Sequence, residues 1–200
     1  MVTVVAQLTA TRTPRVAVLL SGAGTTLAAL IHAVQCGQLR ANIVLVCSDQ
    51  AEANGLQIAK HAGVAAVSIA RGGFANKGAF EDALLAAVAS AEPDWIVLAG
   101  FMRVLSARVC SAWTGRAINL HPSLLPKYPG LDTHARAIAA GDIEAGASVH
   151  YVSAELDGGA VIVQVRVPIL TGDSADALAA RVKQAEQTLL VNCLQTLCAG

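Results

Sequence analysis

Two polar residues separated by one apolar residue stand in the run Ile118-Asn119-Leu120-His121-Pro122. The apolar residues around them predict a strand, and residues two apart on a strand point to the same side. Asn119 and His121 are therefore expected to face one space at the carboxyl end of that strand, where ligands collect in open α/β sheets. An amide NH₂ donates to an oxygen that gains negative charge, and an imidazole accepts and returns a proton near neutral pH. The pair suits acid–base chemistry, although a lone histidine at such a place more often has a structural role.

A carboxylate on a tight turn, Asp157 in Asp157-Gly158-Gly159, is the third candidate. Asp-Gly is a common hairpin signal, so a plain turn accounts for the segment. Alternatively, the carboxylate points at His121, where it would favour the protonated imidazole and order a water molecule between the two side chains. The separation of the two residues in the sequence does not decide between these alternatives.

The segment 21–26, Ser-Gly-Ala-Gly-Thr-Thr, joins an apolar strand to a segment with helical spacing. Its two glycines allow a ligand to come close to the backbone, and the amides at the start of a helix point toward a bound phosphate. Leu27 stands where the dinucleotide fingerprint needs a third glycine, and the Gly-Lys-Ser/Thr of a Walker loop is absent. The turn therefore suits one phosphate better than a pyrophosphate, with a ligand-free strand-to-helix connection as the alternative.

These candidates need a scaffold that brings distant strand ends together, and alternating apolar runs and helical spacing supply one. Continuous apolar strands between helices are typical of a parallel sheet covered on both faces. We therefore expect an α/β fold, a mostly parallel sheet with helices on both faces and a C-terminal antiparallel extension. The expected strands are 15–20, 42–47, 65–69, 94–100, 116–120, 147–152 and 161–168, and the expected helices are 27–36, 52–62, 77–91 and 174–197. Three prolines between His121 and His134 predict an ordered irregular loop there.

Composition limits the classes of protein to which the chain can belong. Hydrophobic types make up 54% of its 200 residues and charged types 14%, which allows a sizeable core and argues against disorder. The formal net charge of zero does not favour a basic nucleic-acid surface, so an anionic substrate must be attracted by local groups. No apolar run approaches the roughly 20 residues of a membrane span, and no secretory signal is visible.

The five cysteines, at positions 36, 47, 110, 193 and 198, are odd in number and form no Cys-x-x-Cys pair. They predict reduced and mostly buried thiols in a cytoplasmic protein. The scattered cysteines and histidines offer no compact ligand set, so no metal is expected.

Five segments of the chain carry a resemblance to a known family. Through them the chain resembles the phosphoribosylglycinamide formyltransferase family over about residues 15–185. The Asn-x-His-Pro-Ser-Leu-Leu-Pro run that starts at Asn119 is specific to folate-dependent formyl-transferring enzymes, and the Lys-Tyr-Pro-Gly that follows narrows the match to the purine branch. The matching segments are 20–24, 98–103, 119–130, 148–151 and 155–159.

The resemblance implies a Rossmann-like formyltransferase fold and an enzyme of de novo purine biosynthesis that transfers a formyl group. The donor and co-substrate would be 10-formyltetrahydrofolate, and the acceptor would be the amine of N1-(5-phospho-D-ribosyl)glycinamide, here called glycinamide ribonucleotide. These two small molecules are the implied partners, without nucleic acid or membrane, for a monomer or homodimer. We expect a flexible N-terminal tail over 1–14 and a single domain over 15–200, with a nucleotide-binding half at 15–118 and a catalytic and folate half at 119–200.

The resemblance also implies roles for individual residues. The implied catalytic trio is Asn119, His121 and Asp157. The residues implied to bind glycinamide ribonucleotide are Gly24, Thr25, Thr26, Lys183 and Glu186. The residues implied to bind folate are Lys77, Met102, Arg103, Val104, Leu105, Asn119, Ser153, Ala154, Glu155, Leu156 and Asp157. Relatives often have Asn, Arg and His where this chain has Thr26, Lys77 and Asp132, and a lysine keeps the charge of an arginine without its planar fork.

Three other functions share part of this pattern. A formyltetrahydrofolate hydrolase would use the same trio with water in place of the amine, but such enzymes usually carry an N-terminal regulatory domain that the 14 residues before the first strand do not hold. A methionyl-tRNA formyltransferase would need a C-terminal RNA-binding domain and a basic surface. A non-enzymatic nucleotide-binding module would account for the glycine turn and leave Asn119 and His121 without a task.

Overall fold

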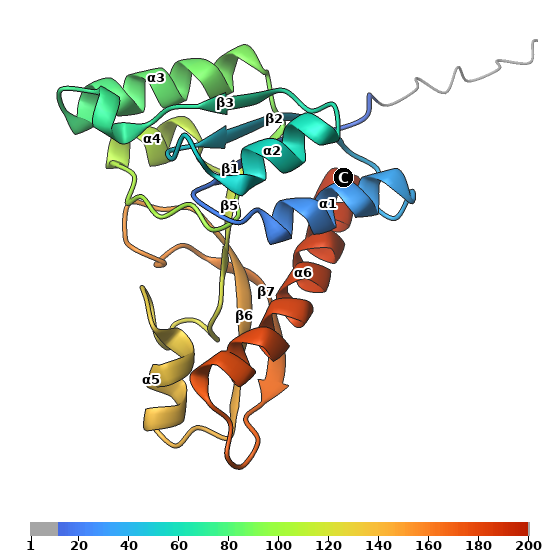
Figure 1. The fold of residues 1–200 in the computed structure, drawn as a ribbon, viewed down its shortest axis with the longest axis vertical. Helices are drawn as coiled ribbons and strands as arrows, with labels where there is room; N and C mark the ends of the chain where they lie inside the picture. The colour runs from blue at the N-terminus through green and yellow to red at the C-terminus, as the bar shows by residue number, and fades with distance from the viewer. Residues whose placement is uncertain (1–11, 200) are drawn as a thin grey trace, which may run out of the picture.

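The computed structural model describes residues 12–199, and within them seven strands form one sheet in the order β3-β2-β1-β4-β5-β6-β7 (Figure 1). The strands are β1 (Arg15–Leu20), β2 (Asn42–Ser48), β3 (Ala66–Ser68), β4 (Trp95–Leu98), β5 (Ala117–His121), β6 (Glu144–Tyr151) and β7 (Val161–Pro168). The helices are α1 (Thr25–Gln35), α2 (Asn54–His61), α3 (Lys77–Ser90), α4 (Ala107–Ala112), α5 (Thr133–Ala139) and α6 (Ala175–Ala199), with a short 3-10 helix η1 (Arg71–Gly73). No helix in this part of the chain combines the length and the apolar character that a membrane span requires.

β1 lies in the centre of the parallel part of the sheet, paired with β2 on one side and β4 on the other. Its side chains alternate between two buried cores. Val16, Val18 and Leu20 belong to the core shared with α1, α2 and α6, while Ala17 and Leu19 belong to the core shared with α3 and α4. A strand buried on both faces has to be apolar at every position, as the continuous run in the sequence is. The expected parallel sheet with helices on both faces is confirmed.

The sheet changes direction at β5, which pairs with β4 in parallel and with β6 in antiparallel orientation. β6 and β7 form the expected C-terminal antiparallel extension, and α6 packs along both strands and against α1 (Figure 1). This change of direction places Asn119 opposite His150, and His121 opposite Ser148. The strand end that carries the candidate residues therefore lies between a parallel and an antiparallel neighbour.

Two helices, α4 and α5, are not predicted by the sequence pattern. α4 has only six residues, too few for a clear helical spacing. Its start is held by the buried carboxylate of Glu81, which accepts hydrogen bonds from the backbone N and the Oγ of Ser106 at 2.8 and 2.6 Å. α5 begins directly after Asp132, whose φ of 56° closes the proline-rich loop. The irregular loop thus covers 122–132 and ends before the expected boundary at His134.

The expected N-terminal tail falls largely on residues 1–11, which lie outside the described residues. The remaining residues of that segment contact the domain. Arg12 donates to a carboxylate oxygen of Asp94 at 2.6 Å, and the carbonyl of Pro14 accepts from the backbone N of Asn42 at 2.8 Å. These contacts tie residues 12–14 to the starts of β2 and β4, the two strands beside β1.

Asp173 secures the start of α6. Its carboxylate accepts two hydrogen bonds from Arg181, at 2.7 and 2.8 Å, and one from the backbone N of Leu170 at 2.8 Å. The bonds from Arg181, and then the bond from Leu170, lower the pKa of Asp173 to about 2. A carboxyl whose pKa is lower in the folded than in the unfolded chain stabilises the fold above its unfolded pKa, and this effect is lost as the pH falls through the folded pKa.

We therefore expect Asp173→Asn to lower the melting temperature by a few degrees near neutral pH. The difference from wild type should shrink as the pH falls toward about 2, because the wild-type carboxyl then gains its proton. Thermal unfolding followed by circular dichroism over this pH range measures the difference. A gap between the two proteins that stays constant from neutral to acidic pH would contradict this account.

Candidate active site

The structure brings the three predicted residues Asn119, His121 and Asp157 together. Nδ2 of Asn119 donates to Oδ1 of Asp157 at 3.3 Å, and Nδ1 of His121 lies 3.4 Å from Oδ2 of the same carboxylate. The carboxylate thus lies between the amide and the imidazole, and the side chains of His121 and Asp157 are only 7% and 9% exposed. The alternative of a plain turn, with a carboxylate that points away from His121, does not describe this geometry.

Asp157 reaches this place because the turn that carries it is tightly constrained. Its own φ is 51°, in the left-handed region, and its Oδ2 accepts a hydrogen bond from the backbone N of Gly130 at 2.8 Å. Two residues further on, a Cβ at Gly159 would lie 1.7 Å from the carbonyl oxygen of Tyr151, so this position admits only glycine. The turn therefore packs against the end of β6 and directs the carboxylate inward.

His150 is a member of this group that sequence reasoning missed. It lies on β6 directly opposite Asn119, and it is 2% exposed. Nδ1 lies 2.9 Å from the carbonyl of Tyr151, and because a carbonyl only accepts, Nδ1 carries a proton. In the neutral ring Nε2 is then an acceptor, and it lies 3.0 Å from Nδ2 of Asn119 and 3.6 Å from Oδ1 of Asp157. The position of His150 on an expected strand was readable, but its cross-strand partner was not.

The surroundings of Asp157 favour its ionised form. Burial by itself raises the pKa of this carboxyl. The protonated form of His150, which donates from Nε2, the hydrogen bond from Gly130 and the charge of His121 act in the opposite direction, and together they hold the pKa of Asp157 below its ordinary value. The group is therefore a carboxylate near neutral pH and is available as a hydrogen-bond acceptor.

His121 faces acceptors on both sides of its ring. Besides the contact of Nδ1 with Asp157, its Nε2 donates to the carbonyl of Tyr128 at 2.9 Å. Tyr128 belongs to the loop 122–132, which therefore covers the ring. An imidazole held between a carboxylate and a carbonyl can carry a proton on each nitrogen without leaving either donor unpaired.

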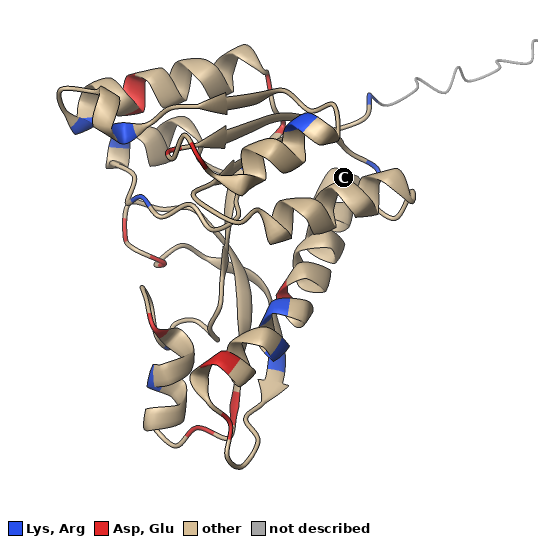
Figure 2. Ribbon diagram, viewed as in Figure 1, with Lys and Arg blue, Asp and Glu red and all other residues tan. Residues whose placement is uncertain are grey.

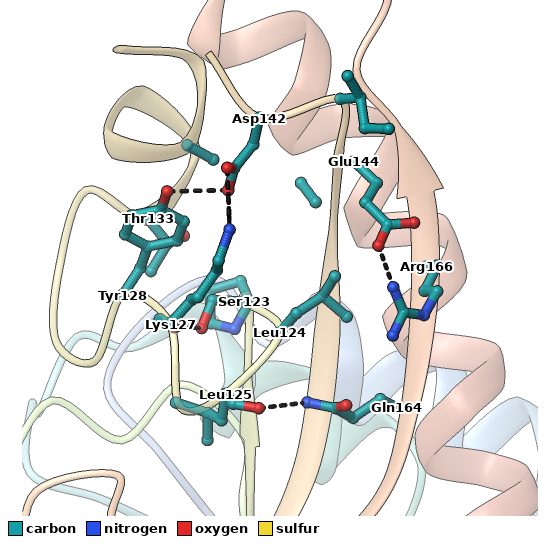
Figure 3. A pocket seen from close by; sticks show the side chains of 14 residues that line it. Ser123, Leu124, Leu125, Lys127, Tyr128, Thr133, Asp142, Glu144, Gln164 and Arg166 are labelled. Carbon is teal, nitrogen blue, oxygen red and sulfur yellow. Dashed lines mark hydrogen bonds and ion pairs between the residues drawn. The ribbon is translucent and has the colours of Figure 1, made fainter. Parts of the chain in front are cut away.

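A pocket of about 350 Å³ lies beside the loop that covers His121, and residues of that loop form part of its lining (Figure 3). In this pocket Asp142 accepts hydrogen bonds from Nζ of Lys127 and from the hydroxyl of Tyr128, at 2.9 and 2.8 Å. Nε2 of Gln164, on β7, donates to the carbonyl of Leu125 at 2.9 Å. None of the predicted site residues lines this pocket, and its hydrogen bonds hold the loop residues Leu125, Lys127 and Tyr128.

A second pocket, of about 280 Å³, lies at the glycine turn and is here called the turn pocket. It is lined by residues 21–26, Ala99, Gly100, Met102 and Lys183. Nζ of Lys183 donates to Oγ1 of Thr26 at 3.0 Å and to Oε1 of Glu186 at 2.6 Å. The structure thus brings the predicted nucleotide-binding residues together, with Lys183 and Glu186 contributed by α6 from the other expected half of the domain. Positive and negative residues are interspersed over the described elements (Figure 2), so attraction for an anion rests on such local groups.

Gly24 also has a role in packing, which the prediction that a ligand approaches the glycine turn did not include. Its φ is 73°, and a Cβ at this position would lie 2.5 Å from the Cα of Gly55, the second residue of α2. A Cβ at Gly22 would instead meet nothing within 4 Å, so this position is open to solvent or ligand. The turn therefore needs one glycine for packing and leaves the other exposed toward the pocket side.

A third pocket, here called the loop cleft, lies between the residues after β4 and the loop before β7. Its lining is Leu98, Phe101, Arg103, Val104, Leu105, Asn119, His150, Val152, Ser153, Ala154, Glu155, Leu156 and Asp157. Nine of the eleven residues predicted to bind folate are in this lining. Val104 and Leu156 are more than half exposed, so the cleft has apolar side chains open to solvent.

Two of the residues predicted to bind folate do not line the loop cleft, and neither does His121. Met102 lines the turn pocket instead. Lys77 lies at the start of α3, where its Nζ is 3.7 Å from a carboxylate oxygen of Glu81. His121 is buried behind Asp157, under the loop that carries Tyr128.

In this α/β fold the turn pocket and the loop cleft thus flank the segment after β4. Residues 14–194 match the model of the formyl transferase family, and the chain belongs to that family. Members of the family use formyl-folate as co-substrate.

Relatives and solved structures agree with this assignment. The chain is 44% identical to the phosphoribosylglycinamide formyltransferase of Escherichia coli (strain K12), over 87% of this chain and 82% of that protein. It is also 44% identical to the trifunctional purine biosynthetic protein adenosine-3 of Drosophila melanogaster, over 94% of this chain but only 14% of that longer protein. The crystal structure of phosphoribosylglycinamide formyltransferase from Brucella melitensis superimposes with a TM-score of 0.90 at 48% identity, covering 94% of this chain and 97% of that one. The expected fold is therefore confirmed by similarity to solved members.

Proposed function

We propose that this chain transfers the formyl group of 10-formyltetrahydrofolate to the amine of glycinamide ribonucleotide, a step of purine biosynthesis. The observation that carries the proposal is the contact of Asn119, His121 and Asp157 beside a cleft lined by the predicted folate-binding residues. The turn pocket, with the amides at the start of α1 and the ammonium group of Lys183, suits the phosphate of the acceptor. The named relatives favour this transfer over hydrolysis of the formyl donor.

In the proposed reaction the acceptor amine attacks the formyl carbon, and the formyl oxygen becomes an oxyanion. A donor directed at that oxygen stabilises the transition state by roughly 3 kcal/mol. Nδ2 of Asn119 and Nε2–H of His121 are the donors that the site offers. Both are engaged by protein acceptors in the described arrangement, Asn119 by His150 and Asp157, and His121 by Tyr128. The substrate oxygen therefore has to replace these partners when it binds, as is common for catalytic hydrogen bonds that form only in the complex.

A proton must then leave the new ammonium and reach the departing folate nitrogen. Asp157 is ionised and lies next to His121, so it accepts a hydrogen bond from the ammonium directly or through a water molecule. The protonated ring of His121 gives its proton to the leaving folate nitrogen, and the proton that leaves the ammonium, carried by the water molecule or by Asp157, returns to the ring. After the transfer the carbon–nitrogen bond to folate is broken, and the products are the N-formylated nucleotide and tetrahydrofolate.

The proposal is tested by an absorbance assay for 10-formylfolate consumption, with and without glycinamide ribonucleotide. Consumption that requires the acceptor and yields the formylated nucleotide is the expected result. Formate release at the same rate without the acceptor would instead identify a hydrolase. No consumption under either condition would leave only a nucleotide-binding module.

Lys183→Met provides a test of the turn pocket. The loss of the ammonium group should raise KM for glycinamide ribonucleotide by about tenfold, since a charged hydrogen bond to phosphate contributes roughly 1.5–3 kcal/mol. KM for the folate donor should be unchanged, because Lys183 does not line the loop cleft. The matched control is Lys60→Met on the exposed end of α2, which should leave both values as in wild type. Equal increases in both KM values would place Lys183 outside the proposed role.

A further inference from the structure

Asp49, the residue after β2, is a buried charged group that the proposed reaction does not use. It is 2% exposed. Its Oδ1 accepts a hydrogen bond from Oγ of Ser21 at 2.5 Å, and its Oδ2 accepts from Nε of Arg103 at 2.5 Å. Gln50 donates to Oδ2 from Nε2 at 3.2 Å. A carboxylate removed from water is strongly destabilising unless its partners stay in place, so these contacts restrict where Ser21 and Arg103 can lie.

Ser21 passes this constraint on to the neighbouring segment. Its Oγ accepts a hydrogen bond from the backbone N of Met102 at 2.8 Å, and its backbone N donates to the carbonyl of Gly100 at 2.9 Å. The glycine turn is thus bonded to the segment after β4. Met102 lines the turn pocket and Arg103 lines the loop cleft, so two consecutive residues form the wall between the two pockets.

We propose that Asp49 is a positioning residue that fixes the position of this shared wall. It acts through Oδ1 and Ser21 on the nucleotide side, and through Oδ2 and Arg103 on the folate side. The inference rests on the proposed function, because it assigns the two pockets to the two substrates. It explains why one buried carboxylate has partners from two segments 82 residues apart, at positions 21 and 103. It also implies that Asp49 holds Nε of Arg103, while the rest of the guanidinium is directed to the loop cleft, which Arg103 lines.

The two carboxylate oxygens of Asp49 have different partners, so we expect two substitutions of this residue to have different effects. In Asp49→Asn, the carbonyl oxygen still accepts from Ser21, but the amide NH₂ faces the Nε–H of Arg103, so two donors oppose each other. In Asp49→Ala, both acceptors are lost. Asp49→Asn should therefore loosen Arg103 alone, whereas Asp49→Ala should loosen both sides of the wall.

Calorimetric titration of each ligand alone measures the two sides separately, with glycinamide ribonucleotide for one and a non-transferring 10-formylfolate analogue for the other. We expect Asp49→Asn to weaken binding of the folate analogue by about tenfold and to leave nucleotide binding unchanged. Asp49→Ala should weaken both by about tenfold. The matched control is Asp173→Asn, the same change at a carboxylate bonded to Arg181, outside the lining of both pockets, which should lower stability without altering either affinity.

Wild-type affinities in Asp49→Asn, with a lower melting temperature only, would overturn the inference and make Asp49 a structural carboxylate. This test does not require Asp49→Ala to fold. A second readout needs no ligand: the Nε–H of Arg103 should be protected from hydrogen exchange in wild type and lose this protection in Asp49→Asn, and an unprotected wild-type signal would also overturn the inference. Failure of the proposed function is a different result, since it appears in the wild-type enzyme as a lack of turnover.

Discussion

Replacing His121 by alanine is expected to lower kcat by about a thousandfold, within the range typical of a lost general acid–base. The substitution removes the Nε2 donor that the oxyanion needs and the proton that the leaving folate nitrogen takes up. KM for both substrates should change little, because His121 lines neither the turn pocket nor the loop cleft. Steady-state kinetics with both substrates varied measures the separation of kcat from KM.

The matched control for this change is His61→Ala. His61 lies exposed at the end of α2, where its Nδ1 is 2.8 Å from the carbonyl of Gln57, four residues earlier. Its removal should leave kcat and KM as in wild type. If His121→Ala is folded by circular dichroism and turns over at a near-normal rate, the proposed mechanism is wrong.

Replacing Asp157 by asparagine is expected to lower kcat by about a hundredfold or more near neutral pH. The amide keeps the shape of the side chain but cannot accept at both positions that face His121 and Asn119. Since the wild-type pKa lies below its ordinary value, the carboxylate is ionised at neutral pH and gains a proton only in acid. The difference in rate between wild type and Asp157→Asn should therefore have its full size near neutral pH. It should shrink as the pH falls below the ordinary pKa range of an aspartate.

Rates of both proteins over this pH range, from single-turnover experiments, measure that difference. Asp82→Asn is the matched control, because Asp82 is an exposed carboxylate on α3 that pairs with Arg108 away from both pockets. A rate difference for Asp157→Asn that stays constant into acid would exclude the carboxylate charge as the cause of its effect.

Much of the parallel sheet could be predicted from the sequence, because a strand buried on both faces has no polar positions. The run 15–20 was expected as a strand and is β1 at the same bounds. The run 161–168 is likewise β7 at the same bounds. The other five expected strands exist with ends shifted by one to three residues, since the last residue of a strand is set by its neighbour in the sheet rather than by its own type. α4 escaped prediction for the same kind of reason, since the group that holds its start, Glu81, lies on α3, 25 residues before Ser106.

The candidate site divides in the same way. That Asn119 and His121 share a side follows from the period of two in a strand, and that the glycine turn precedes a helix follows from local residue types. That Asp157 points at His121 was one of two open alternatives. His150 was missed, because its role depends on a cross-strand pairing with Asn119 that crosses 31 positions.

The sequence by itself determined which segments are apolar on both faces, where strands give way to turns, and that an amide and an imidazole lie side by side at one strand end. These properties depend on residues that are neighbours in the sequence, because the backbone geometry of a strand or helix decides from their spacing to which side each side chain points. Only the tertiary structure decided which distant groups meet them: Asp157 from a later loop, His150 from the antiparallel strand, Lys183 from α6 at Thr26, and Asp49 between Ser21 and Arg103. Such long-range contacts depend on the order of the strands in the sheet and on which charges become buried. The pattern of residue types along the chain indicates neither, because both are decided only when the whole core packs together.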